Sequence, residues 1–111
     1  MAVLTVAKKI TVSAGSEGTT VLYTVKSAQK LKLTEVQFCF PTGSNFLLGL
    51  AIQRGPYRVC PKEGLVYGEN KVIKLEDDSV FDSGSEVLLY YKNEDASNDH
   101  SAVVIITGEL E

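Results

Sequence analysis

The strongest constraint on the fold is an alternation of apolar and polar residues in short segments. Residues 31–38 read LKLTEVQF, and successive side chains of an extended strand point to opposite sides, so the apolar set faces a core and the polar set faces water. Other runs are rich in the β-branched and aromatic residues that favour strands; they are residues 20–26, 72–75, 87–91 and 102–106. The last two are apolar on both faces, which is typical of central strands or of strands covered by a partner.

Short turn segments separate these runs. Each contains Gly, Asn or Pro, which accept the positive or fixed φ angles of tight turns; they lie at residues 14–18, 41–45, 54–56, 62–64, 68–70 and 82–85. Turn signals about 8–12 residues apart are typical of an all-β sandwich or barrel. The nearest helical candidate, residues 27–30, is too short to form a helix on its own. We therefore predict one domain over residues 1–111, an all-β antiparallel β-sandwich of eight or nine strands.

The distribution of charge and apolar residues argues against several functions. The net charge is −3 and the basic residues are scattered, whereas a nucleic-acid binder needs a clustered basic face. No apolar run reaches the about 20 residues of a membrane span. The N-terminal sequence MAVLTVAKK carries its charge after its apolar stretch, the reverse of a secretory signal. We expect a first strand here, in a protein made in the cytoplasm without a signal peptide.

The two cysteines, Cys39 and Cys60, do not form a CxxC redox motif or a recognisable half of a zinc site. Cys39 lies in the apolar run VQFCF, where a buried free thiol is the usual state, and a reducing compartment favours that state. A disulfide between them requires neighbouring strands, so the sequence leaves both states open.

Residues 93–100, NEDASNDH, combine the single histidine of the chain with several oxygen ligands. An EF-type calcium loop needs Gly at its sixth position and Glu at its twelfth, and this segment has neither. An irregular cation site would instead draw on aspartates of several turns, namely Asp77, Asp78, Asp82, Asp95 and Asp99. We favour a polar connection between two apolar strands, because Asn, Asp and Ser favour turns. We expect His100 to be a surface side chain, since no further zinc ligand accompanies it.

No group of residues has the pattern of a catalytic site. The serines lack the GxSxG context of a nucleophile, and the Gly15/Gly18 pair does not begin a helix after a strand. The acidic run Glu76-Asp77-Asp78 is half of a glycosidase pair or, as we favour, a solvated turn. We predict a non-enzymatic protein with no catalytic, metal or cofactor-binding residues and no cofactor.

The segment FLLGLAI at residues 46–52 has no polar side chain, so both faces of this strand are apolar. One face meets the core, and the other is covered or forms a patch of the kind that marks interfaces. Arg and Tyr, which follow this segment, are enriched at protein contacts. The alternative is a central strand that these residues merely border. The predicted interface consists of Phe46, Leu48, Leu50, Ile52, Arg54, Tyr57 and Arg58.

The order of segments along the chain carries a resemblance. An apolar N-terminal arm precedes GSEGTT at residues 15–20, a turn FDSGSEV occupies residues 81–87, and a closing strand VVIITGE occupies residues 103–109. This layout resembles the small jelly-roll or β-sandwich modules of virion structural proteins, such as capsid-decorating (cement) proteins and the head domains of phage fibres. The resemblance covers nearly the full chain.

The resemblance implies a jelly-roll-like module of a virion that decorates or stabilises a capsid or fibre. Its partners would be other protein chains: further copies in a homo-oligomer, often a trimer, and a major capsid or fibre protein, with no nucleic acid and no membrane. The alternative is a carbohydrate- or receptor-binding sandwich. Its sugar platform would use exposed aromatic rings, and although the chain has no Trp, it offers Tyr57, Tyr67, Tyr90 and Tyr91.

Overall fold

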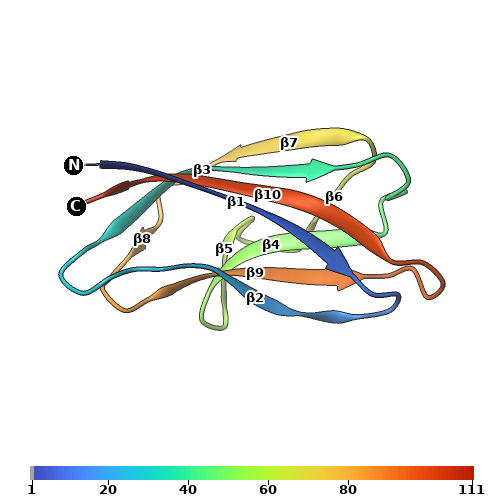
Figure 1. Ribbon diagram of the computed structural model, residues 1–111, viewed down its shortest axis with the longest axis horizontal. Coiled ribbons are helices and arrows are strands. Elements are labelled where there is room, and N and C mark those ends of the chain that lie inside the picture. The colour runs from blue at the N-terminus through green and yellow to red at the C-terminus, as the bar shows by residue number, and fades with distance from the viewer. Residues whose placement is uncertain (1) are drawn as a thin grey trace.

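The computed structural model describes residues 2–111 and consists of two sheets packed face to face (Figure 1). Its strands are β1 (Ala2–Val12), β2 (Glu17–Thr24), β3 (Leu31–Phe40), β4 (Leu48–Arg54), β5 (Tyr57–Cys60), β6 (Val66–Tyr67), β7 (Lys71–Glu76), β8 (Val80–Phe81), β9 (Glu86–Asn93) and β10 (His100–Leu110). The predicted all-β antiparallel sandwich is confirmed. The count is ten strands rather than eight or nine because β6 and β8 have only two residues each.

The strand order is that of a jelly roll. The first sheet has the order β1-β10-β3-β7, with β8 also paired to β3, and the second has the order β2-β9-β4-β5, with β6 also paired to β4. If β5 with β6, and β7 with β8, are each counted as one interrupted strand, every sheet has four strands and the first strand pairs with the last. Eight strands in two such sheets are the jelly-roll arrangement.

This topology separates the connections into two groups (Figure 1). The loop end of the sandwich carries four connections, which are residues 13–16, 41–47, 68–70 and 94–99. The terminal end carries both chain termini and three connections, which are residues 25–30, 55–56 and 82–85. The segment 27–30, the nearest helical candidate, is part of a turn at the terminal end, where Ala28 has a φ of 65°.

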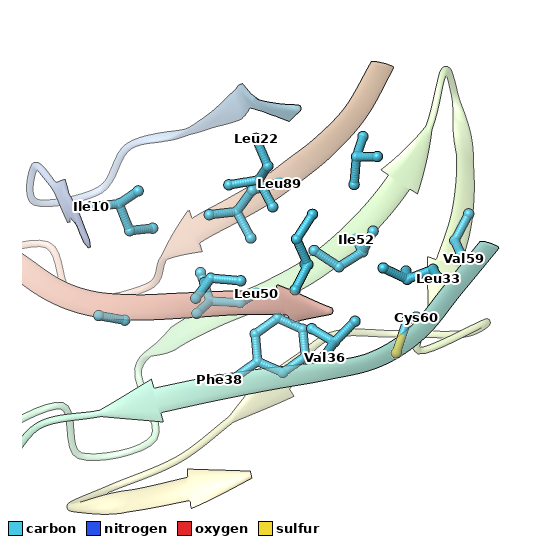
Figure 2. Close-up of a cluster of buried hydrophobic side chains, with 14 of the residues drawn as sticks. Ile10, Leu22, Leu33, Val36, Phe38, Leu50, Ile52, Val59, Cys60 and Leu89 are labelled. Atoms are coloured by element: carbon cyan, nitrogen blue, oxygen red, sulfur yellow. The ribbon is translucent and has the colours of Figure 1, made fainter. Parts of the chain in front are cut away.

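The core lies between the two sheets and contains the inward side chains of both (Figure 2). Leu33, Val36 and Phe38 of β3 are fully buried there against Leu50 and Ile52 of β4. The strict alternation predicted for residues 31–38 fails at one point, because Leu33 and Val36 both face inward. The pairing with β10 shifts here, with Gly108 opposite Leu33 and Thr107 opposite Glu35. Thr34 is therefore an extra residue, a β-bulge.

The bulge also explains Gly108. A Cβ atom at this position would lie 2.7 Å from the carbonyl oxygen of Lys32 and 2.8 Å from a methyl carbon of Leu31. Only glycine lets the two backbones approach this closely where the register shifts.

Both cysteines are free thiols, and they lie on different sheets. Cys39 of β3 is half-buried and Cys60 of β5 is buried. Burial, followed by the charge of Asp77, raises the pKa of the Cys60 thiol to about 11, so this thiol is not activated as a nucleophile.

Candidate functional site

The structure corrects the placement of three residues of the predicted interface. Leu48, Leu50 and Ile52 have exposed fractions of 0% and point into the core, where Figure 2 shows the last two. Their position follows from strand geometry, because these alternate residues of β4 all face the first sheet. Their side chains therefore form core contacts and are not on the outer surface.

The outer face of β4 is covered by the chain itself. Gly49 and Ala51 point outward, and both are buried. A Cβ atom on Gly49 would lie 2.7 Å from Leu65 and 2.8 Å from the ring of Tyr67, so the side chains of these two residues, at and next to β6, cover this face from the neighbouring strand. The apolar character of residues 46–52 thus serves the core on one side and this cover on the other.

The other four residues of the predicted interface lie at two separate places. Phe46, 64% exposed, is at the loop end, whereas Tyr57, 70% exposed, is at the terminal end beside the turn that follows β4. The length of β4 separates them by roughly 20 Å. Arg54 and Arg58 are close to Tyr57 in the sequence, so Phe46 is alone at its end.

Both arginines are held by contacts within the chain. Nη1 of Arg54 donates a hydrogen bond to the Val80 carbonyl oxygen at 2.6 Å, and its guanidinium lies over the Phe81 ring. The guanidinium of Arg58 lies 4.3 Å from the centre of the Tyr90 ring. A cation that stacks on an aromatic face is attracted by the ring electrons, and here the stacking covers Tyr90 on the outer face of the second sheet.

The loop of residues 94–99 is the predicted polar connection between two apolar strands, and hydrogen bonds within the chain hold it in place. Its anchor is Asn93, the last residue of β9, which is 2% exposed. The Asn93 Nδ2 group donates hydrogen bonds to the carbonyl oxygens of Val12 at 3.1 Å and Asn98 at 2.9 Å. Its Oδ1 accepts a hydrogen bond from the Asp95 N–H. One buried amide thus joins the loop to the end of β1.

The expectation of a surface histidine is wrong. His100 has a side chain only 10% exposed, and its Nε2 lies 2.9 Å from Oδ2 of Asp95. Asp95 also accepts hydrogen bonds from the backbone N–H groups of Ser97 and Asn98. The Ser97 N–H, then His100 and the Asn98 side chain, lower the pKa of Asp95 to about 2. The carboxylate therefore acts as the central acceptor of the loop.

Glu69 has the same role for the neighbouring connection, residues 41–47. Its carboxylate accepts hydrogen bonds from the N–H groups of Gly43 and Asn45, and these bonds, with Asn45 first, lower its pKa. Asn45 and Phe46 have positive φ angles of 51° and 57°, a backbone state that a bulky side chain rarely adopts. The carboxylate holds the loop in this form, with the Phe46 ring exposed.

A third contact joins the loop end to the outer face of the second sheet. Burial, followed by a side-chain hydrogen bond with Glu94, raises the pKa of Tyr67 to about 12. The Tyr67 hydroxyl is therefore a donor to the Glu94 carboxylate across the physiological range. Sequence analysis did not identify Glu69, Tyr67 or Glu94 as partners, because each contact joins segments that are distant along the chain.

The five aspartates of the hypothetical cation site do not converge. Asp95 and Asp99 belong to the loop end, where Asp99 Oδ1 accepts a hydrogen bond from the Ala14 N–H, whereas Asp82 is at the terminal end, 3.9 Å from the Lys30 ammonium. Within residues 2–111, no three His, Cys, Asp or Glu side chains gather so that they could hold a metal ion. The same described residues include no helix long and apolar enough to cross a bilayer.

Comparison with known proteins finds similarity in structure alone. No family model matches the sequence, and no curated protein matches it. A chain of the cyanophage Pam1 capsid asymmetric unit is similar at a TM-score of 0.63 and 9% identity, over 96% of this chain and 83% of that one. A chain of the Helicobacter pylori bacteriophage KHP30 capsid is similar at a TM-score of 0.55 and 11% identity, over 97% and 94% of the two chains.

A larger viral chain contains the same fold as one part. It belongs to the structure of Sulfolobus Turreted Icosahedral Virus, with a TM-score of 0.62 and 13% identity. The match covers 98% of this chain but only 29% of that one. The predicted resemblance to jelly-roll proteins of virions is confirmed at the level of the fold.

Proposed function

We propose that this protein is a non-enzymatic structural module of a virion, which decorates or stabilises a capsid or fibre through protein–protein contacts. One observation carries the proposal: the jelly-roll topology over 96% of the chain is shared with a chain of a cyanophage capsid, of which it covers 83%. In both chains the sandwich accounts for most of the residues.

The distribution of exposed apolar side chains supports this role. The exposed large hydrophobic residues occur on both sheets and at both ends of the molecule; they are Val3, Val21, Phe46, Tyr57, Val72 and Val80. An enzyme or a small-ligand receptor gathers its apolar surface in a concave pocket with a few convergent polar groups. Apolar contacts that point in several directions suit a module with several neighbours, as a shell or fibre supplies.

The alternative of carbohydrate binding loses much of its basis. It depended on four tyrosines, but Arg58 covers Tyr90, Tyr67 packs on Gly49, and Tyr91 packs against the core. Tyr57 alone is strongly exposed, and a sugar platform needs a broader aromatic surface. A glycan array would restore this alternative if it showed saturable binding that Tyr57→Ala abolished.

The proposal is tested by light scattering over a wide range of protein concentration, together with co-sedimentation with coat-protein shells from the same source. We expect a defined oligomer, or association of the protein with the shells, because a structural module functions through such contacts. A protein that remains monomeric at every concentration and leaves the shells unoccupied would contradict the proposal.

A further inference from the structure

The outer edges of the two sheets differ in how they are protected against further strand pairing. An edge strand presents unpaired N–H and C=O groups, so proteins blunt such edges with short strands, charges, prolines or bulges. The edge formed by β5 and β6 is protected because these strands are short, with four and two residues. Pro56 and Pro61 flank β5 and add to this protection. In the first sheet, the edge away from β1 consists of β8, with two residues, and β7. On β7 the charged residues Lys71, Lys74 and Glu76 are exposed.

The edge at β2 is also protected. Its register with β9 shifts between Val21 and Tyr23, which marks a bulge. The Lys8 ammonium crosses to this strand and donates hydrogen bonds to the Thr20 hydroxyl at 3.2 Å and to the Val21 carbonyl oxygen at 3.4 Å. A bulged strand whose carbonyl group already has a partner is a poor template for another strand.

The edge at β1 has none of these protections. This strand is 11 residues long and pairs with β10 without any register shift, from Ala2 opposite Leu110 to Val12 opposite His100. Residues 2–7 contain no charge and no proline. Val3 has an exposed fraction of 76%, the largest among the exposed large hydrophobic side chains of residues 2–111.

The hydrogen bonds around β10 show which groups of β1 are free. Glu111 and Lys30 exchange two backbone hydrogen bonds, at 2.9 and 3.1 Å, so the Glu111 groups point toward β3. Successive residues of a strand direct these groups to opposite sides, so Leu110 directs its own toward Ala2, its partner on β1. Alternation along β1 then directs the N–H and C=O groups of every second residue at the open edge; within residues 2–7 these are Val3, Thr5 and Ala7.

We propose that a second copy of this chain pairs with this edge, antiparallel, through residues 3–7 of each β1, so that the two first sheets join into one. The inference deepens the proposed assembly role and rests on it, because it names one contact through which the module assembles. Open backbone donors and acceptors require another β-strand as their partner. Residues 2–7 carry no charge, so two copies of this segment can pair without placing like charges next to each other.

That charge pattern distinguishes the possible alignments. In a parallel pair, Lys8 and Lys9 of the two copies would lie side by side, and like charges on adjacent strands are destabilising. In an antiparallel pair centred on Thr5, the lysines of each copy lie beyond the hydrogen-bonded residues 3–7 and at opposite ends. The contact is then two-fold symmetric, which is the commonest symmetry of protein dimers.

The same alignment covers Val3. Opposite residues of an antiparallel pair direct their backbone groups either both toward each other or both away, so the residues with open groups must face one another: Thr5 lies opposite Thr5, and Val3 of each copy lies opposite Ala7 of the other. Val3 and Ala7 are both exposed on the outward side of β1, so each covers part of the other as a cross-strand pair. The two-fold axis is perpendicular to the joined sheet, so the outer sides of the two copies form one continuous surface and both second sheets lie on the same side of it.

The first test compares two valines by sedimentation equilibrium of the full chain. Val3→Lys places a charge on the β1 edge, and Val72→Lys places the same charge on the first sheet at β7, where the valine is 56% exposed. We expect Val3→Lys to raise the dissociation constant of self-association by roughly tenfold or more, since the symmetric contact is altered twice. Val72→Lys should leave the dissociation constant unchanged.

The second test removes a backbone donor. Proline is tolerated on an edge strand where its missing N–H would face outward, so Thr5→Pro should preserve the folded monomer and abolish pairing. Thr11→Pro is the matched control, because Thr11 lies on the same strand with the same orientation but outside residues 2–7. On association, hydrogen exchange should slow selectively at the amides of Val3, Thr5 and Ala7.

Each contrary outcome is distinct from a failure of the proposed function. An oligomer, such as a trimer, that neither Val3→Lys nor Thr5→Pro weakens would overturn the edge contact and leave the assembly role standing. A monomer at every concentration would also overturn it, and co-sedimentation with shells would then test the assembly role separately. Shell binding lost in Val3→Lys by a monomeric protein would assign the edge to a different partner and overturn the second copy.

Discussion

The two ends of this sandwich are held together by different means. At the loop end, buried or partly buried polar side chains connect the loops: Asn93, Asp95 and Glu69 accept or donate several hydrogen bonds each. At the terminal end, the turns are closed mainly by backbone hydrogen bonds, such as those between Lys30 and Glu111 and from the Val25 N–H to Ser85. A polar network has many partners to lose, so the loop end should be the more sensitive to mutation and to acid.

The largest effect should come from Asn93→Ala at the loop end. The substitution removes the buried amide and leaves the carbonyl oxygens of Val12 and Asn98 without this donor. Buried polar groups that lose their partners are costly, and we expect the free energy of unfolding to fall by about 2–4 kcal/mol. Denaturant unfolding followed by circular dichroism measures this change.

The matched change at the terminal end is Ser83→Ala. The Ser83 hydroxyl donates a hydrogen bond of 2.7 Å to the Gln29 carbonyl oxygen, but this site is exposed, so water can replace the donor. We expect a loss of about 0.5 kcal/mol or less. Equal losses for Asn93→Ala and Ser83→Ala would remove the contrast between the two ends.

A smaller effect should appear as a dependence of stability on acid. The pKa of Asp95 is about 2 in the folded protein and 3.8 for an unperturbed carboxyl group, so the folded state favours the carboxylate. This contribution to stability is fully present above pH 3.8 and is lost as the pH falls from 3.8 through about 2. Thermal unfolding of the wild type and Asp95→Asn across this window measures it. Two melting curves that decline in parallel would show that Asp95 is not responsible.

The smallest effects on stability should come from the two exposed aromatic residues, one at each end. Phe46→Ser and Tyr57→Ser should each change the free energy of unfolding by about 0.5 kcal/mol or less, because neither ring is buried. These two variants instead test association with other chains, which light scattering and co-sedimentation with shells measure. Loss of association in one variant alone would assign that end of the sandwich to a partner.

Most of the fold could be predicted because strand periodicity is a local property. The apolar residues of β3 and the turn segments between runs mark the strands directly in the sequence. Even the bulge has a signal, since Thr34 and Glu35 are two successive polar residues between the inward Leu33 and Val36. The pairing order of the strands has no comparable local signal, because it depends on contacts between distant segments.

The candidate surfaces were harder to predict, for the same reason. The segment of residues 46–52 is apolar on both sides, but whether its outer face is open depends on Leu65 and Tyr67, which return from later in the chain. His100 could have been assigned better, because Asp95 is only five residues away in the same loop. That β1 is an edge strand with unpaired backbone groups follows only from the strand order of the sheet.

Both chain termini lie at the same end of the sandwich, which fixes the direction in which a fused protein would extend. Ala2 and Leu110 are cross-strand partners at one end of a molecule 44 Å long. A protein fused to either terminus would therefore extend from the end opposite the loop end. A short linker could also join the two neighbouring termini, which is the first step of a circular permutation.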